Sequence, residues 1–462
     1  MFPKHLNIQN FIFLYRMELI AIISLIVFAL ILIYLSWRFG DVSSENAYSM
    51  ANGKAKHIFI AFGAFTVIGA STFVGVVQFT YLAGAYVLAL GLGAGLGAWL
   101  LSNKGEKIYA LAKKEEYHSL PDAIAERYGM YAGTLSTIIS VVTLGALLII
   151  QIAVGGLIIS FLTGISAELG ALILTLVVGI YVFTGGLKAV FVTDLLQGVG
   201  MFLLFIGSLI AMYILGGATP TELVVNTTPV ELSFGLISLI IIFFFTGFLS
   251  ITGGADIWLR YFSGKSFEES RKGLRFAGIM FIAFILLLVF FGLHVVMQLP
   301  DAVPGEAFVR YITEVLPQWI IPLAVIGIFA GALSTADAET HVISSMLSKE
   351  RSRWKNRTLP SLNFQRYSVI VILLLAYLIT IFSGFNPGDM FTAFLNIIMA
   401  TGAAAWMLIF NKGNKNGMAV GLTLSLIIFI ILTTSGLLFQ GLWGLLIPLS
   451  VVIPCLVTKK QK

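Results

Sequence analysis

Long apolar runs are the feature that most limits how this chain can fold. Thirteen of them are long enough to cross a hydrocarbon layer of about 30 Å as helices. The 462 residues are 58% hydrophobic and only 11% charged, and no soluble core could bury that much apolar surface. In lipid, helices satisfy every backbone polar group, so we predict an all-α polytopic membrane protein. The runs lie at about residues 17–38, 55–78, 81–102, 132–162, 168–184, 189–216, 232–256, 274–298, 317–346, 367–384, 389–411, 417–434 and 438–458.

Lysine and arginine are unevenly distributed over the connections between these runs. With the N-terminus outside, all 28 Lys and Arg except Lys4, Arg16 and Arg310 fall in or beside inner loops. The outer connections, such as 216–231, are rich in Pro, Thr and acidic residues. The positive-inside bias therefore predicts an outside N-terminus and a cytoplasmic C-terminus in the cell membrane. The basic cluster of loop 347–366 is then a topology signal, with a lipid or nucleic-acid contact as the alternative.

No long polar segment separates the apolar runs, so we expect residues 1–462 to form one integral membrane domain. It would comprise a leading helix and loop (17–54), a core (55–411) and two trailing helices with a tail (412–462). No phosphate-gripping Gly-x-x-x-x-Gly-Lys-Ser/Thr pattern occurs, so ATP is not the expected energy source. A single cysteine, Cys455, excludes an internal disulfide or a cysteine metal cluster. We expect no organic cofactor and no nucleic-acid partner, and a monomer able to function, with the oligomeric state left open.

Two runs contain glycine and hydroxyl residues near their centres, where a membrane helix is normally apolar. They are 67–75 (Val-Ile-Gly-Ala-Ser-Thr-Phe-Val-Gly) in the second run and 249–256 (Leu-Ser-Ile-Thr-Gly-Gly-Ala-Asp) in the seventh. Five runs apart, they cross the membrane in opposite directions, as an inverted repeat of five plus five helices requires. An interrupted helix frees backbone carbonyls, which are good ligands for a hard cation. Alternatively, the hydroxyls of Ser71, Thr72 and Thr252 bond back within continuous helices.

The ninth run carries Ser334 and Thr335 side by side, with Asp337 one turn beyond Ser334. Polar groups at this depth are costly without partners and usually mark an ion or solute path. Two uncharged hydroxyls could complete an oxygen cage for a sodium ion. Asp194 is a further acid at membrane depth. It could bind a second cation, relay a proton together with Asp337, or pair with an inner-loop base such as Lys188.

Several motifs in a fixed order resemble the sodium:solute symporter family, which includes the proline and pantothenate permeases and the sialic acid and sodium/glucose cotransporters. The motifs are Gly-Ala-Ser-Thr-Phe-Val-Gly (69–75), Leu-Pro-Asp-Ala-Ile-Ala-Glu-Arg-Tyr-Gly (120–129), Gly-Gly-Leu-Lys-Ala-Val-Phe-Val-Thr-Asp-Leu-Leu-Gln (185–197), Arg-Tyr-Phe-Ser-Gly-Lys-Ser (260–266) and Leu-Ser-Thr-Ala-Asp-Ala (333–338). The resemblance implies a ten-helix inverted-repeat core of the leucine-transporter type, formed by runs two to eleven. The count of thirteen runs is similar to that of the proline permease branch.

The same resemblance implies a sodium site built from five residues. Its ligands would be the backbone carbonyls of Ala70, Phe73 and Gly331 and the hydroxyls of Ser334 and Thr335.

Two departures from the family pattern limit what else the resemblance implies. Asp194 corresponds to an acid that helps to bind a second sodium in some members, but Asp337 and Ala338 replace the hydroxyls that accompany it there. The segment 254–256 (Gly-Ala-Asp) stands where Gln-Pro-His is common, so the solutes of the family do not transfer to this chain.

The solute pocket should lie at the membrane midplane, between the broken helices and the fourth run. The polar residues available there are Thr72, Gln78, Gln151, Thr246 and Ser250. None of them is cationic, which favours a small polar or zwitterionic solute over a polyanion. For Gln151, a hydrogen bond between helices is an equally good interpretation.

Together these features predict a secondary active symporter, not an enzyme, that couples inward sodium movement to uptake of a small organic solute by alternating access. Two alternatives remain open at the level of sequence. One is a proton-coupled transporter that uses Asp194 and Asp337. The other is a transport-dead sensor or receptor that keeps the fold.

Overall fold

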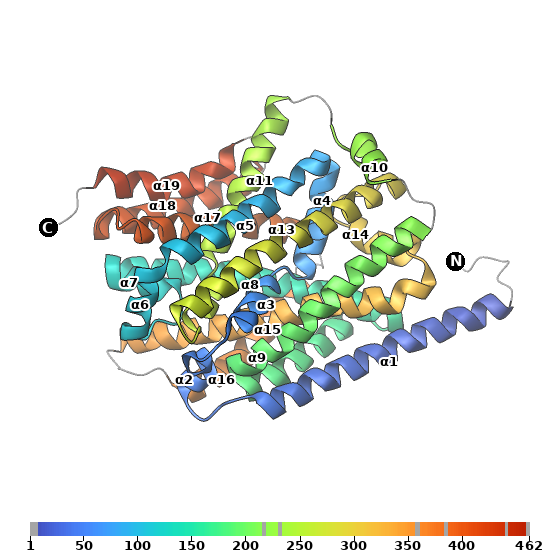
Figure 1. The fold of residues 1–462 in the computed structure, drawn as a ribbon, viewed down its shortest axis with the longest axis horizontal. Coiled ribbons are helices and arrows are strands. Elements are labelled where there is room, and N and C mark those ends of the chain that lie inside the picture. The colour runs from blue at the N-terminus through green and yellow to red at the C-terminus, as the bar shows by residue number, and fades with distance from the viewer. Residues whose placement is uncertain are drawn as a thin grey trace.

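The computed structural model describes residues 8–214, 219–229, 233–355, 361–382, 387–438 and 442–458. Within these ranges the chain is helical, apart from one isolated bridge between Ala55 and Gly264 and short connections (Figure 1). The α-helices are α1 (Ile8–Phe39), α2 (Glu45–Met50), α3 (His57–Phe65), α4 (Ala70–Ala83), α5 (Leu88–Lys104), α6 (Glu106–Glu115), α7 (Leu120–Tyr128), α8 (Met130–Thr163), α9 (Ala167–Ile214), α10 (Pro220–Thr227), α11 (Phe234–Gly253), α12 (Ala255–Phe262), α13 (Phe267–Gln298), α14 (Ala307–Arg310), α15 (Ile321–Trp354), α16 (Leu362–Phe382), α17 (Pro387–Ile409), α18 (Lys415–Thr434) and α19 (Leu446–Val457).

Nine helical segments among the described residues are long and apolar enough to cross a membrane. They are Leu19–Phe39, Ala70–Lys104, Met130–Thr163, Ala167–Gly207, Phe234–Gly253, Phe267–Gln298, Ile321–Trp354, Leu362–Phe382 and Lys415–Thr434. Two shorter apolar helical stretches, Ala393–Ile409 and Trp443–Val457, follow the same pattern. The all-helical membrane architecture predicted from the sequence is therefore confirmed.

The 48-residue helix α9 contains a reversal of direction at Gly186, whose φ of 64° is readily adopted only by glycine. Tyr181 and Thr193 lie on opposite sides of this turn and would be about 18 Å apart along a straight helix. Both hydroxyls nevertheless lie within hydrogen-bond distance of the same Asp337 oxygen, at 2.8 and 3.5 Å. The two limbs of α9 therefore fold back on each other, as runs 168–184 and 189–216 predict.

Helices α4 and α5 also run in opposite directions, and their contacts with α13 show it. An added Cβ at Gly292 of α13 would touch Thr80 near the end of α4. Arg275, near the start of α13, instead hydrogen-bonds Asn103 at the end of α5. Since α4 runs parallel to α13 while α5 runs antiparallel to it, the segment Ala70–Lys104 is a hairpin.

Two interrupted helices cross near the centre of the molecule: α3 and α4 are separated by residues 66–69, and α11 and α12 meet at Gly254. The start of α3 lies beside the end of α12, because Ala55 pairs with Gly264. Further along, Thr72 of α4 lines the same cavity as Ser250 of α11. The two interrupted helices are therefore antiparallel, and their breaks lie at the same level.

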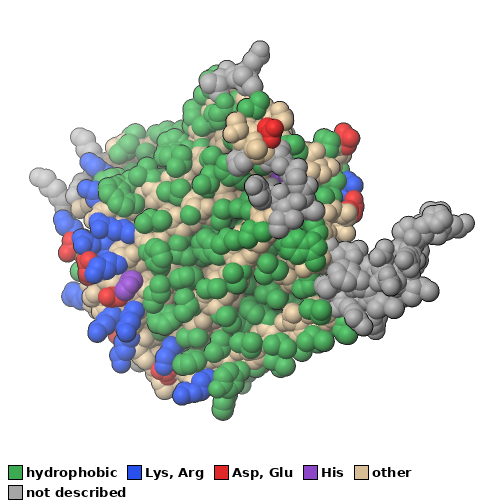
Figure 2. Space-filling view, turned by 45° about the vertical axis from the view of Figure 1, so that its right-hand side comes forward, with side chains coloured by type: hydrophobic (Ala, Val, Ile, Leu, Met, Phe, Trp, Pro, Cys, Tyr) green, Lys and Arg blue, Asp and Glu red, His purple; other side chains and the backbone are tan. Residues whose placement is uncertain are grey.

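The outer surface divides into an apolar band and a charged end. Figure 2 shows hydrophobic side chains over most of the visible face, with Lys and Arg gathered at one end. Exposed residues of α1 such as Ile23, Leu30 and Trp37 belong to the apolar surface. Arg353 of α15 also forms an ion pair with Asp122 of α7.

Helix α15 extends beyond the predicted ninth run, which was expected to end at 346, and continues to Trp354. The added turns are stabilised by polar contacts with the connection before α7, including a 2.7 Å hydrogen bond from Lys349 Nζ to the Glu116 carbonyl. The predicted loops 216–231 and 347–366 lie partly outside the described residues, as do the predicted ends of the chain.

Candidate functional site

The break between α3 and α4 exposes backbone groups to α15. The last helical bond of α3 runs from the Thr66 N–H to the Phe62 carbonyl at 2.9 Å, and α4 begins only at Ala70. Gly69 precedes α4 with φ −90° and ψ −167°, an extended conformation. The Thr66 carbonyl therefore lies past the end of α3, where it is available to other donors.

Four neutral oxygens meet at this break. The Thr335 hydroxyl lies 3.0 Å from the carbonyls of both Thr66 and Gly331, and the Ser334 hydroxyl lies 3.3 Å from each of them. Thr66, Ser334 and Thr335 are fully buried. We call these four atoms the oxygen cluster. Carbonyl and hydroxyl oxygens are the ligands that hard cations prefer, so the chemistry of the cluster fits a sodium ion.

Glycine allows the break and α15 to approach this closely. A Cβ added at Gly69 would lie 1.9 Å from Thr335 Oγ1 and 2.7 Å from the Gly331 carbonyl oxygen. A Cβ added at Gly331 would lie 3.0 Å from the Phe73 ring and 3.3 Å from the Ala70 nitrogen. All five residues predicted for the sodium site are thus brought together, with Ala70 and Phe73 in the first turn of α4. The Thr66 carbonyl was not predicted, because a backbone oxygen leaves no mark in the sequence.

A second polar group lies between α9, α12 and α15. Asp337 accepts a 2.8 Å hydrogen bond from the Tyr181 hydroxyl. Asp194 lies 3.4 Å from the Arg260 guanidinium, which is also 3.6 Å from Asp256. All five side chains are almost completely buried.

Arg260 is a buried charged residue of this region that the sequence analysis did not single out. Lys188 had been considered as a base for Asp194, but the ion pair that the structure shows is with Arg260, on another helix. The available signal was the spacing of Asp256 and Arg260, four residues apart at the end of an apolar run. That spacing places both on one face of a helix, and two charges there need buried partners.

Carboxylates outnumber cations in this buried region. Besides Asp194, Asp256 and Asp337, it contains Glu339, and neither Glu339 oxygen has a hydrogen-bond partner among the described residues. Arg260 is the cation that contacts these acids in the described part of the chain. Burial of several ionised carboxylates around one guanidinium is unfavourable, so the region calls for bound cations or protons.

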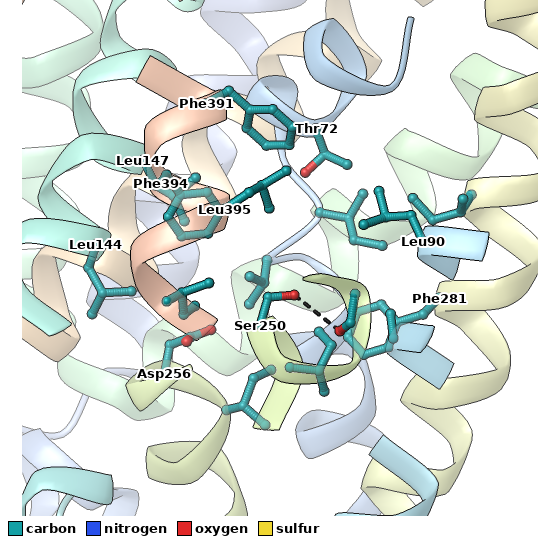
Figure 3. A pocket seen from close by; sticks show the side chains of 18 residues that line it. Thr72, Leu90, Leu144, Leu147, Ser250, Asp256, Phe281, Phe391, Phe394 and Leu395 are labelled. Atoms are coloured by element: carbon teal, nitrogen blue, oxygen red, sulfur yellow. Dashed lines mark hydrogen bonds between the residues drawn. The ribbon is translucent and has the colours of Figure 1, made fainter. Parts of the chain in front are cut away.

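A cavity of about 70 Å³ lies between the two interrupted helices and α17 (Figure 3). Its polar lining residues are Thr72, Ser250 and Asp256, and the others are apolar or glycine. Figure 3 shows Thr72 and Asp256 at opposite ends of the group of lining side chains. The cavity therefore has the midplane position, between the broken helices, that was predicted for the solute pocket.

Two of the five residues predicted for the solute, Thr72 and Ser250, line this cavity, and the other three lie elsewhere. Gln151 hydrogen-bonds the backbone N–H and hydroxyl of Ser71 at 3.2 and 2.7 Å, which is the helix-to-helix contact considered as its alternative. The Thr246 hydroxyl lies 3.6 Å from the Met399 sulfur, and Gln78 is not among the lining residues. Asp256 was missed as a lining residue because its direction depends on how α12 leaves the break.

A family model described as the sodium:solute symporter family matches residues 48–424, most of the chain. The chain belongs to this family. Its members are transporters, not enzymes, and the match agrees with the resemblance inferred from the motifs. The chain is thus a multi-pass membrane protein of a family that couples sodium to the movement of small solutes.

Individual relatives agree with this assignment. The sodium/pantothenate symporter of Haemophilus influenzae is 27% identical in a match that covers 91% of this chain and 90% of the relative. A Na⁺-coupled sialic acid symporter in a substrate-bound, outward-open state superimposes with a TM-score of 0.77 at 19% identity, covering 94% of this chain and 96% of that one. A nucleobase-cation-symport-1 family transporter in a closed conformation gives a TM-score of 0.59 at 13% identity, covering 90% and 95%. The two structures show that the chain has the same fold as these transporters.

Proposed function

We propose that this protein takes up a small organic solute by alternating access, driven by sodium that binds at the break between α3 and α4. The ligands would be the Ala70, Phe73 and Gly331 carbonyls with the Ser334 and Thr335 hydroxyls. The observation that carries the proposal is the oxygen cluster, which is buried and neutral and joins an interrupted helix to α15. The Thr66 carbonyl would either bind sodium as a further ligand or give up its hydrogen bonds from Ser334 and Thr335 when sodium binds.

Sodium at this position would act by holding two structural units together. The hydroxyls of Ser334 and Thr335 belong to α15, and Ala70 and Phe73 belong to the first turn of α4. An ion bound to both stabilises the form in which α4 packs against α15. The solute cavity shares α4 with the sodium site through Thr72, so the solute binds better to that form. Loss of sodium on the inner side would therefore also weaken binding of the solute and release it.

For the whole chain we propose thirteen membrane spans, with spans two to eleven (55–411) as an inverted repeat of five plus five helices. The antiparallel crossing of the two interrupted helices supports the repeat. Residues 17–54 and 412–462 would flank this core within a single domain. We propose that the charged end in Figure 2 is cytoplasmic and that the N-terminus is outside, in accord with the positive-inside bias.

The available driving force suits accumulation of a solute. One positive charge that moves inward across about 100 mV releases roughly 2.3 kcal/mol. A tenfold sodium gradient adds about 1.4 kcal/mol. One sodium per cycle therefore supports accumulation of a neutral solute by several hundredfold, and a solute with a positive charge would be accumulated further by the membrane potential.

Asp194 and Asp337 form the second part of the proposal, as a site for a second cation or a proton. The specific observation is the excess of buried carboxylates over cations described above. Tyr181 and Thr193 would complete the site, since both hydroxyls lie within hydrogen-bond distance of Asp337. Transport coupled to protons alone through these acids is the competing mechanism.

Reconstitution in proteoliposomes tests the proposal directly. We expect counterflow and concentrative uptake of a transported solute to require an inward sodium gradient and to be reduced in Ser334→Ala and Thr335→Ala. Equal uptake with sodium replaced by potassium, driven by a pH gradient, would instead favour proton coupling. Solute binding without any counterflow would favour a sensor that keeps the fold.

A further inference from the structure

The cavity in Figure 3 is charged at one end only. Eighteen residues line it, and Asp256 is the sole ionisable one among them. Among the described residues, the lining includes no lysine, arginine or histidine. Phe281, Phe391 and Phe394 give the cavity an aromatic and apolar wall. A solute that fits this lining therefore has an apolar body and one polar end.

Asp256 is poorly satisfied by the protein itself. Its side chain is 2% exposed, and its Oδ2 atom has no hydrogen-bond partner in the described part of the chain. The nearest cationic group is Arg260 Nη1 at 3.6 Å, which is too far for a hydrogen bond. Arg260 is also shared with Asp194, at 3.4 Å. The three groups carry a net charge of −1 when all are ionised, and a cation bound in the cavity that Asp256 lines would neutralise this charge.

The two remaining polar groups do not favour an anion. The Ser250 hydroxyl donates to the Gly247 carbonyl at 3.1 Å, which leaves its oxygen as an acceptor toward the cavity (Figure 3). Thr72 lies at the far end from Asp256. A carboxylate solute would meet the Asp256 charge without any cationic partner in the lining. An ammonium group would find a carboxylate, a hydroxyl acceptor and aromatic faces.

We propose that the solute of this transporter is an organic amine: an ammonium group on an apolar body, bound through Asp256, with no carboxylate of its own. This inference rests on the proposed function and narrows its solute class. It departs from the solutes named for the two relatives, pantothenate and sialic acid, both of which carry a carboxylate.

Matched probes on one apolar body test the charge preference. The full-length protein in detergent is titrated, in sodium buffer, with 2-phenylethylamine, 2-phenylethanol, 3-phenylpropionate and phenylalanine, and with butylamine, butanol and pentanoate as a smaller set. Thermal stabilisation reports binding. For at least one body, we expect the amine to bind about tenfold or more tightly than the alcohol, and the carboxylate to bind least. Stabilisation by a carboxylate or by phenylalanine that equals or exceeds that of every amine overturns the proposal, as does no stabilisation by any amine.

Variants at the cavity test whether Asp256 is the source of the preference for amines. Asp256→Asn should bring the amine and the alcohol to within about threefold of each other, whereas Asp256→Glu should keep a preference for the amine. Gly145→Ala on α8 is the control that should leave the amine preference unchanged, because an added Cβ there meets nothing within 4 Å. An unchanged amine preference in Asp256→Asn refutes the role of Asp256. If that variant does not fold, the ranking of the probes on the wild-type protein still decides the solute class.

The experiments can refute the amine proposal and the symport proposal independently of each other. Sodium-driven uptake of a carboxylate would leave the proposed symport intact and overturn the amine assignment. Amine binding that is equally strong in sodium and in potassium would keep the amine assignment and count against sodium coupling.

Discussion

Replacement of Gly69 by alanine should weaken sodium binding while leaving the two hydroxyls of the proposed site in place. The added Cβ would lie 1.9 Å from Thr335 Oγ1, whereas ordinary contacts begin at 3.4 Å. Rotation of the Thr335 hydroxyl is not enough, because the added Cβ would also lie 2.7 Å from the Gly331 carbonyl oxygen; the break and α15 must separate by about 0.7 Å, the difference between 3.4 and 2.7 Å. The backbone at Gly69 is extended, with φ −90°, so alanine adds no torsional strain of its own. The effect of the substitution is then purely steric.

Overpacking of a well-packed interior typically costs about 1–3 kcal/mol. If that cost falls on the sodium-bound form, the sodium concentration for half-saturation rises about 5- to 150-fold. The assay is a sodium titration of tryptophan fluorescence or thermal stability on monodisperse protein. Gly145→Ala on α8 is the matched control, because a Cβ there meets nothing within 4 Å. Half-saturation of Gly69→Ala within about twofold of the control would refute sodium binding at the break.

Three further predictions follow from the same contacts. Ser334→Ala and Thr335→Ala should each raise the sodium concentration needed for uptake with near-normal expression, since each removes one neutral oxygen; unchanged sodium titrations in both would contradict the site. Asp194→Asn should lower transport and shift its sodium or pH dependence. The variant should still insert, because Asp256 remains beside the Arg260 guanidinium. Normal transport at every sodium concentration and pH would mean that the Asp194–Arg260 ion pair is purely structural. In a cysteine-free background, a cysteine at Thr227, but not one at the exposed Trp354, should react with an impermeant maleimide in intact cells, and the reverse pattern would invert the proposed topology.

The features that could be predicted from the sequence are those that depend on a few adjacent residues. Glycine and hydroxyl residues indicated an interruption within 67–75, and the helix is broken at 66–69, while Ser334 and Thr335 lie buried against this break. The turn between runs five and six was expected near Lys188 and lies at Gly186. Each of these follows from a few adjacent residues.

The features that the sequence did not predict depend on how helices pack. Arg260 meets Asp194 across 66 positions of the chain, and only the placement of α12 beside α9 brings them together. Gln151 was a candidate for the solute because it is polar at the right depth, yet its amide is used by Ser71 on another helix. Composition indicates that a buried polar group needs a partner. It does not indicate which of several partners, protein or solute, the packing supplies.

The neutrality of the oxygen cluster has a consequence for the kinetics of the transport cycle. Two carbonyls and two hydroxyls carry no formal charge, so a sodium ion in the cluster brings one full elementary charge through the bilayer. The emptied cluster returns with none. Membrane voltage then accelerates the loaded half of the cycle and leaves the return step at this site unaffected. The voltage dependence that this site gives to the solute-induced current should therefore arise in the sodium-loaded half of the cycle.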